Sequence, residues 1–339
     1  MQTFVASVFV FGLIVLVHEL GHFFVARLTG IKVLELAIGF GPKLISRRVN
    51  DTDYSLRIFP LGGFCRLLGE NPEEASDPDS FPQKPVISRA AVLLAGAGMN
   101  LLLAIVVLFV IFFFIAGVPN TDTAGIGYIV EGSPAEASGF EAGDMIRSID
   151  GEDVAAWEDV LRIISAKPNE ELRIIIVREG IARELTVVSE TAPESERGMI
   201  GIGPVVEKYR LLVSLRLSLE RFSAVIVSII QVVTGRAPLD IAGPVGIVFV
   251  IGEVAQTGFM NLLMLTALIS ISLGIMNLLP IPALDGGRLF FLIVEAVRGK
   301  RIDPEKEGFI HFIGFALLIL LILFITYQDL LRWDIIPGN

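Results

Sequence analysis

Cysteine and histidine are scarce in this sequence, and their scarcity limits the sites that it can build. Cys65 is the only cysteine, which excludes a disulfide framework and a metal site made of thiolates. Two of the three histidines, His18 and His22, stand four residues apart. We therefore expect histidine-based chemistry near residue 20, and we interpret Cys65 and His311 as structural or incidental.

Charge is also sparse. The chain has 27 basic and 37 acidic residues and a net charge of −10, which argues against nucleic acid as a partner. Hydrophobic residues make up 53% of the chain, and the mean hydropathy is +0.71. This composition excludes an ordinary soluble domain. It predicts a polytopic α-helical membrane protein with some segments outside the membrane, in water.

Four apolar runs are long enough to cross a lipid bilayer as helices. They span residues 3–27, 90–116, 259–279 and 309–327. The first run lacks the basic start and the cleavage site of a signal peptide, so we expect it to remain as a spanning helix. Basic residues gather between positions 28 and 88 and again after position 298, which predicts that both loops are cytoplasmic and both termini lie outside.

The loop between the first two runs, residues 28–88, has the pattern of short strands. Residues 54–59 alternate in polarity, and two glycines and a proline at 39–42 interrupt the pattern. Strands are expected at residues 33–38, 44–49, 54–59 and 64–68. The loop is either an ordinary connection or a small membrane-associated sheet whose edge can pair with an extended peptide. With its flanking helices it forms a first region, residues 1–121.

Three regions follow. Residues 122–206 are acidic, with strand patterns around one helical stretch at 157–166, and they predict an extracytoplasmic domain. In residues 207–258, the apolar stretch 211–233 carries several charges in its first half, so an amphipathic helix in the outer interface is favoured over a span. Residues 259–339 hold the last two spans.

The sequence His-Glu-Leu-Gly-His at residues 18–22 lies inside the first apolar run. On a helix, His18 and His22 share one face, where two neutral imidazoles can hold one metal ion. Glu19 beside them can accept a proton from the attacking water. Ionisable side chains are costly at membrane depth, which marks these three as functional candidates. Two imidazoles and an oxygen ligand suit zinc.

A catalytic zinc usually has three protein ligands, so a third must come from elsewhere in the chain. Asp285 is the best candidate, because it is an acid within a break of an apolar region that Pro280 and Pro282 mark. Glu295 and Glu253 are weaker alternatives. A new helix is expected after Asp285, so a role as the N-cap of that helix is also open.

Two asparagines are candidates for substrate binding. Asn277 lies in the same break, where its amide can bond a substrate backbone or a developing oxyanion, or can cap carbonyls freed at the helix end. Asn100 follows the small residues 95–98 in the second run. A hydrogen bond within the helix bundle is the simplest role for Asn100, and a position near the metal is the alternative.

These segments together resemble the site-2 protease family of intramembrane zinc metalloproteases. The resemblance rests on His-Glu-Leu-Gly-His at 18–22, Asn-Leu-Leu-Pro-Ile-Pro-Ala-Leu-Asp-Gly at 277–286 and Gly-Ala-Gly-Met-Asn at 96–100. The inserted domain resembles a single PDZ domain of the bacterial type through residues 132–135, 139, 143–146 and 150–151. These likenesses cover nearly the whole chain.

The resemblance implies that His18, His22 and Asp285 bind zinc, that Glu19 is the general base, and that residues 33–68 form a membrane-associated β-loop. It also implies a protease of the bacterial inner membrane that cleaves single-span membrane proteins, such as anti-sigma factors or remnant signal peptides. Two other classes stay open: a membrane-tethered PDZ scaffold with a structural metal site, and a metal transporter. A transporter needs a polar path, for which the other spans carry too few carboxylates and histidines.

Overall fold

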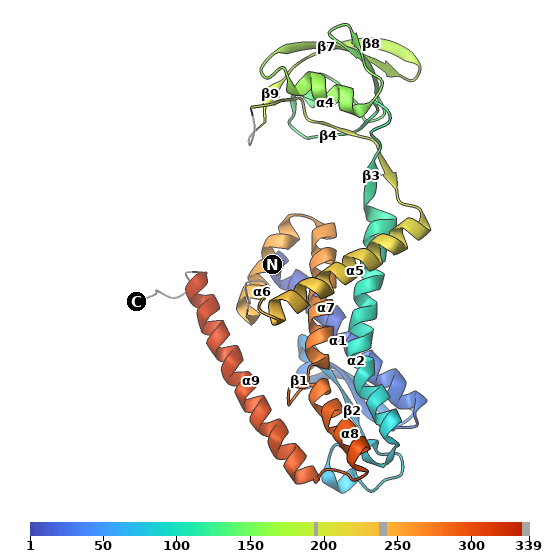
Figure 1. Cartoon of the computed structure of the whole chain (residues 1–339), viewed down its shortest axis with the longest axis vertical. Helices are drawn as coiled ribbons and strands as arrows, with labels where there is room; N and C mark the ends of the chain where they lie inside the picture. The colour runs from blue at the N-terminus through green and yellow to red at the C-terminus, as the bar shows by residue number, and fades with distance from the viewer. Residues whose placement is uncertain (193–195, 237–242, 334–339) are drawn as a thin grey trace. The chain divides into compact units, whose positions relative to one another are not determined.

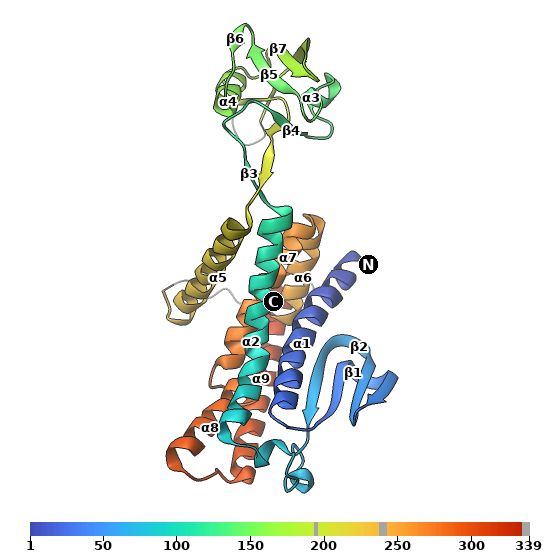
Figure 2. The same cartoon turned by 90° about the vertical axis from the view of Figure 1, so that its right-hand side faces the viewer.

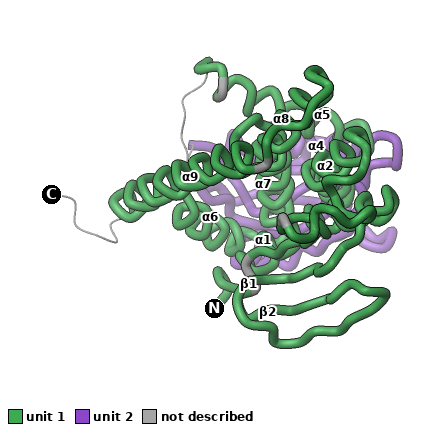
Figure 3. Tube along the Cα trace, turned by 90° about the horizontal axis from the view of Figure 1, so that it is seen from below, with its two compact units in different colours: residues 1–111, 215–339 green, residues 112–214 purple. Residues whose placement is uncertain are grey.

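The computed structural model describes residues 1–192, 196–236 and 243–333. The chain divides into two compact units (Figure 3). We call residues 1–111 and 215–339 the membrane unit, and residues 112–214 the inserted unit. The inserted unit contains the domain expected at residues 122–206.

Helices dominate the membrane unit (Figure 1). They are α1 Gln2–Leu28, α2 Val86–Val110, α5 Leu211–Val233, α6 Pro244–Gln256, α7 Phe259–Leu278, α8 Asp285–Arg298 and α9 Pro304–Arg332. A π-helical turn, Ile111–Ile115, extends α2, and the short 3-10 turns Pro72–Glu74 and Phe81–Gln83 precede it. Among the described residues, four helices are long and apolar enough to cross a membrane, and they coincide with the four apolar runs: Gln2–Leu28, Val86–Ile115, Phe259–Leu278 and Glu305–Arg332.

Helix α2 packs closely against both α1 and α7 because small residues line the two contacts. A Cβ added to Gly21 of α1 would lie 2.8 Å from the carbonyl carbon of Ala95 on α2. A Cβ added to Gly274 of α7 would lie 3.2 Å from the carbonyl oxygen of Ala97 on α2. The missing side chains of Gly21 and Gly274 therefore let α1 and α7 approach the backbone of α2 closely.

Helix α6 is one element that the sequence pattern does not predict. It begins at Pro244, a residue favoured in the first turn of a helix, and its Ile251 is fully buried in an apolar cluster with α1 side chains. The carboxylate of Asp329 in α9 accepts hydrogen bonds from the backbone N–H groups of Gly243 (3.1 Å) and Gly246 (2.7 Å) at the start of α6. The region expected at the membrane interface thus includes a helix that packs into the bundle.

Strands β1 (Val33–Val49) and β2 (Thr52–Leu67) pair with each other beside α1, and residues 35–38 of β1 pair with two segments of β2, residues 53–56 and 63–66 (Figure 2). The four expected segments, 33–38, 44–49, 54–59 and 64–68, lie within these two strands except for residue 68, and they pair as separate segments. The glycines and the proline near position 40 interrupt the register between the two segments of β1. The turn lies at Asn50 and Asp51, whose φ angles of 46° and 64° are both positive, as a type I′ turn requires.

The inserted unit mixes short strands with two helices. Its strands are β3 Gly117–Pro119, β4 Ile126–Ile129, β5 Met145–Ile149, β6 Glu152–Asp153, β7 Glu171–Arg178, β8 Ile181–Val188, β9 Glu190–Thr191, β10 Gly198–Met199, β11 Ile202–Pro204 and β12 Val206–Lys208, and its helices are α3 Pro134–Ala137 and α4 Trp157–Ser165. The largest sheet has the order β6-β5-β7-β8. Amphipathic α4, close to the predicted helix at 157–166, buries Trp157 and Val160 in the core of this unit.

Candidate active site

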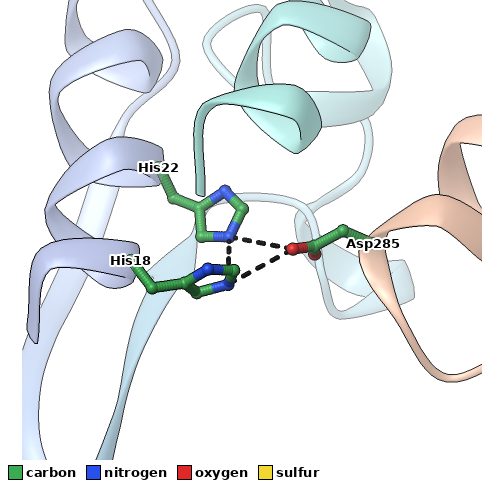
Figure 4. A group of neighbouring side chains, drawn as sticks. All are labelled: His18, His22 and Asp285. Atoms are coloured by element: carbon green, nitrogen blue, oxygen red, sulfur yellow. Dashed lines mark hydrogen bonds and ion pairs between the residues drawn. The ribbon is translucent and has the colours of Figure 1, made fainter. Parts of the chain in front are cut away.

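Three side chains with metal-binding atoms meet in the membrane unit (Figure 4). The Nε2 atoms of His18 and His22 in α1 are 3.1 Å apart. The Oδ2 atom of Asp285, the first residue of α8, lies 3.3 Å from each of them. Within the described ranges, no other group of histidine, cysteine and acidic side chains has this spacing. The structure therefore brings together all three predicted ligands.

The donor set fits zinc. Two atoms bound to a tetrahedral zinc at about 2.0–2.1 Å are roughly 3.3 Å apart, close to the separations of 3.1 and 3.3 Å in this group. The Nδ1 atom of His22 lies 2.8 Å from the carbonyl oxygen of Val92 and donates to it, which leaves the Nε2 lone pair for a metal. Three protein ligands leave one position open, as in catalytic zinc sites.

Helix α2 lies directly behind the imidazoles. A Cβ added to Gly96 would overlap Nε2 of His22 and would lie 2.7 Å from Cε1 of His18. Two residues later, a Cβ added to Gly98 would have nothing within 4 Å. The two rings can therefore pack against the α2 backbone only because residue 96 has no side chain.

The break between α7 and α8 turns Asp285 toward the imidazoles. Pro280 and Pro282 cannot continue α7, because each lacks a backbone N–H and restricts the residue before it. A Cβ added to Gly287 would lie 2.9 Å from the carbonyl carbon of Ile281. The first turn of α8 thus packs on the break itself, which places the carboxylate of Asp285 near α1.

The other possibilities that the sequence left open around Asp285 do not match the structure. The N-cap of α8 is Leu284, so the alternative that Asp285 caps this helix is wrong. Glu295 instead accepts two hydrogen bonds from Arg89 of α2, at 2.6 and 3.0 Å, and this ion pair lowers the pKa of Glu295. Glu253 is exposed on α6 and is outside the group of potential ligands. Neither glutamate takes the place of Asp285.

Glu19 faces a cavity of about 390 Å³ that borders all three potential ligands. Phe64, Cys65 and Leu67 of β2 also line it. In the described part of the chain, residues 63–66 of β2 pair with one neighbouring segment, residues 35–38 of β1, so their other edge has no strand partner. The end of β2 therefore borders the same cavity as the residue predicted to be the general base.

Asn100 and Asn277 differ in their distance from this centre. Asn100 is buried, with its Nδ2 atom 3.5 Å from Nδ1 of His18, and its Oδ1 atom has no hydrogen-bond partner in the described part of the chain. Its backbone carbonyl accepts a hydrogen bond of 2.7 Å from Ser270. Asn277 is half-buried near the end of α7 and is absent from the described cavity lining. Only Asn100 thus lies beside a ligand side chain.

The cavity also contains groups that the sequence pattern did not indicate. Glu70 and Arg288 line it, together with Cys65 of β2. Arg288 follows Asp285 by three residues, so helical spacing alone could have placed both on one face of α8.

Comparisons with known proteins agree with the geometry of the site. The family model of peptidase family M50 matches residues 6–321. The zinc metalloprotease RasP of Oceanobacillus iheyensis is 34% identical, and the alignment covers 98% of this chain and 99% of that protein. The regulator of sigma-W protease RasP of Bacillus subtilis is 32% identical with the same coverage, 98% and 99%.

Solved structures similar to this chain include PDZ domains of SdrC-like proteins. The domain from Listeria monocytogenes is 21% identical, covers 25% of this chain and 88% of its own, and has a TM-score of 0.23. The domain from Listeria innocua is 21% identical, covers 26% and 100%, and has the same TM-score of 0.23. The family match extends over far more of the sequence. The chain therefore belongs to peptidase family M50, the site-2 protease family, and is a zinc metalloprotease.

Proposed function

We propose that this metalloprotease is an endopeptidase that cleaves the transmembrane segments of single-span membrane proteins inside the bilayer. One observation carries the proposal: His18 and His22 lie within a helix long and apolar enough to span, and Asp285 meets them there. Zinc at this position would be reached by a peptide that is itself in the membrane. The scaffold and transporter alternatives lose their support, because the chain is a metalloprotease.

The proposed mechanism assigns a role to each group. Zinc, when bound by His18, His22 and Asp285, supplies Lewis-acid activation for peptide hydrolysis. Glu19 takes the proton of the attacking water and passes it to the leaving amine. Glu19 lines the same cavity as the three proposed ligands, so the base lies beside the metal position before substrate arrives.

A helical substrate must unwind before hydrolysis, because helical carbonyls are bonded within the helix. Unwinding frees backbone groups that have no water to bond in the hydrocarbon region. The end of β2 lines the cavity, and residues 63–66 have a strand partner on one side within the described residues, so an extended segment added to the other edge would satisfy those groups beside Glu19. We therefore assign substrate alignment to the β-loop.

The asparagines receive different proposed roles. Asn100 lies beside His18 and so is suited to steady that ring or a bound peptide backbone. Asn277 lies near the end of α7, where its amide could contact a longer stretch of substrate outside the described cavity lining. Both remain candidates for substrate binding.

We further propose the bacterial inner membrane as the location, with a PDZ domain at residues 122–206 and both termini outside the cytoplasm. Basic residues in the loops after α1 and α8 support this orientation by the positive-inside rule. The Bacillus subtilis relative is named as a regulator of sigma-W. Anti-sigma factors are therefore proposed substrates, together with remnant signal peptides.

The test compares wild type with Glu19→Gln on a single-span reporter in proteoliposomes. The variant keeps the side-chain size but cannot accept the proton, so cleavage should fall by about 1,000-fold. Zinc content, measured on the same samples, should be unchanged, because Glu19 is not a ligand. Full cleavage by Glu19→Gln would overturn the proposal.

A further inference from the structure

The backbone just before Asp285 is held by a side chain of the last helix. The Ala283 N–H donates a hydrogen bond to Nδ1 of His311 in α9, at 2.9 Å. Ala283 has a φ of +79°, which is unusual for a residue other than glycine. A strained backbone of this kind persists only where surrounding contacts hold it. His311 makes one such contact, two residues before the proposed zinc ligand.

Further contacts fix His311 at this position. Its ring packs edge-on against Phe291 of α8, with ring centroids 5.4 Å apart. One turn along α9, a Cβ added to Gly314 would lie 3.0 Å from the carbonyl oxygen of Pro282. The backbone of α9 thus approaches the break closely, and His311 lies between the break and α8.

The hydrogen bond also defines the tautomer of His311. Because Nδ1 accepts the Ala283 N–H, the neutral ring carries its proton on Nε2. The Oε1 atom of Glu307, on the same face of α9, is 3.8 Å from Nε2, which is too long for a hydrogen bond. The contact to Ala283 is therefore the one hydrogen bond that the ring makes among the described residues.

The hydrogen bond between Ala283 and His311 is notable because α9 otherwise makes few contacts with the rest of the membrane unit. Within the apolar stretch of α9, none of the residues in the most hydrophobic part is buried in the structure. A side chain that packs for stability alone would be apolar here, whereas histidine is costly in an apolar span. The Nδ1 atom of His311 accepts its hydrogen bond from Ala283, two residues before Asp285.

We propose that His311 is a positioning residue for the third zinc ligand. Its Nδ1 atom holds the strained Ala283 peptide, and this fixes the direction in which Asp285 leaves the break. The inference rests on the proposed function in one respect, that Asp285 binds zinc. Loss of the acceptor would free the Ala283 N–H and let the break relax, so the carboxylate would move away from the imidazoles.

The experiment compares three variants of the full chain: His311→Leu, His311→Asn and the control Phe312→Leu. Asparagine can offer an oxygen near the position of Nδ1, whereas leucine cannot accept a hydrogen bond. Phe312 is the next residue of α9 and is 67% exposed. Zinc affinity is measured by competition with a chelator, and the visible absorption of the Co²⁺-loaded protein reports the ligand geometry.

His311→Leu should bind zinc about 10–100-fold more weakly and change the Co²⁺ spectrum, as changes to groups that orient metal ligands do. His311→Asn should recover affinity to within a few-fold of wild type, and Phe312→Leu should match wild type. Wild-type affinity and spectrum in His311→Leu would overturn the proposal. Equal losses in the leucine and asparagine variants would overturn it too, because shape and not the acceptor would then matter.

Two further measurements cover a variant that does not fold and a wrong assignment of the zinc ligand. If His311→Leu does not fold, His311→Gln replaces it, since its longer side chain carries the amide past the Nδ1 position. Equal zinc affinity in the glutamine and asparagine variants would then overturn the proposal. Zinc affinity of Asp285→Asn is measured in parallel: if it equals that of wild type, the proposed ligand set fails, and this is distinct from a failure of His311.

Discussion

The proposed metal site has a histidine half, His18 and His22, and an aspartate half, Asp285, and the chain holds them by different means. The histidines lie on an uninterrupted helix, where a spacing of four residues puts both rings on one face. The carbonyl of Val92 and the bare backbone at Gly96 then set the ring orientation. Asp285 follows the break between α7 and α8. Because no continuous helix leads into it, helical hydrogen bonds to the residues before it do not fix its position.

Tertiary contacts replace the missing helix around Asp285. The Arg89–Glu295 pair joins α8 to α2, and the hydrogen bond from Ala283 to His311 joins the break to α9. A change in the histidine half should therefore act directly on ligand atoms. A change in the aspartate half should act through the backbone and have a smaller effect.

The largest effect is expected from Gly96→Ala in the histidine half. The new Cβ would overlap Nε2 of His22, so both imidazoles must move. A displacement of about 1 Å in a catalytic group costs roughly 100-fold in rate, and we expect cleavage of a single-span reporter to fall by that factor. Zinc affinity, measured by chelator competition, should fall as well.

Gly98→Ala is the matched control, because it makes the same change on the same helix with nothing within 4 Å of the new Cβ. It should keep wild-type cleavage and zinc affinity. Equal behaviour of the two alanine variants would contradict the close packing of the imidazoles on α2.

An intermediate effect is expected from Arg89→Met in the aspartate half. The pair is mostly buried, with Arg89 7% and Glu295 14% exposed, so loss of one partner leaves a charge uncompensated. Arg301 lies 3.5 Å from Glu295 and offsets part of this cost. Thermal unfolding should show a loss of about 3 kcal/mol, and zinc affinity should fall several-fold as α8 shifts.

The double variant Arg89→Met with Glu295→Leu separates charge from position. Replacing both partners of a buried ion pair with apolar residues is often nearly neutral, so stability should recover. If the double variant is no more stable than Arg89→Met, the buried ion pair does not explain the loss.

The smallest effect on the site is expected from a change in the inserted unit. Asp144 is fully buried, and burial alone would raise its pKa, but hydrogen bonds of 2.7 and 2.8 Å from Arg178 lower the pKa below its ordinary value. The stabilisation is therefore complete above the unfolded-state pKa of about 3.9 and is lost as the pH falls through the lower folded-state pKa. Asp144→Asn should destabilise this unit at neutral pH and reduce its sensitivity to acid.

Fluorescence of buried Trp157 in a Trp333→Phe background measures this unfolding. Zinc affinity at neutral pH should be the same with and without Asp144→Asn. An unchanged acid transition in the variant would show that Asp144 does not determine it.

The sequence predicted elements that depend on local composition. Apolar runs coincide with the four helices that could span, and the helical spacing of His18 and His22 predicted their shared face. The four strand segments of the loop between α1 and α2 were predicted from their local pattern, but their continuity as two long strands was not, because the glycines near position 40 are compatible with either turns or bulges. Helix α6 was not predicted, since its short apolar stretch alone does not distinguish a packed helix from an interfacial segment.

Asp285 was predicted from its unusual place in a break, but the sequence could not tell whether it binds metal or caps a helix. That choice depends on where the carboxylate points, and the structure places it 3.3 Å from both imidazoles. Cys65 and His311 were interpreted as structural or incidental. The place of Cys65 in the cavity lining and the bond from the Ala283 N–H to His311 follow from the fold and leave no pattern in the sequence.

By itself, the sequence determined the apolar helices and the paired imidazoles, because hydrophobic length and helical periodicity act within one segment. Tertiary structure alone decided that Asp285 joins the imidazoles, that β2 and Glu19 line one cavity and that α9 contacts the break before Asp285. These contacts join residues far apart in the chain. They depend on how closely backbones pack, and that follows from the whole fold.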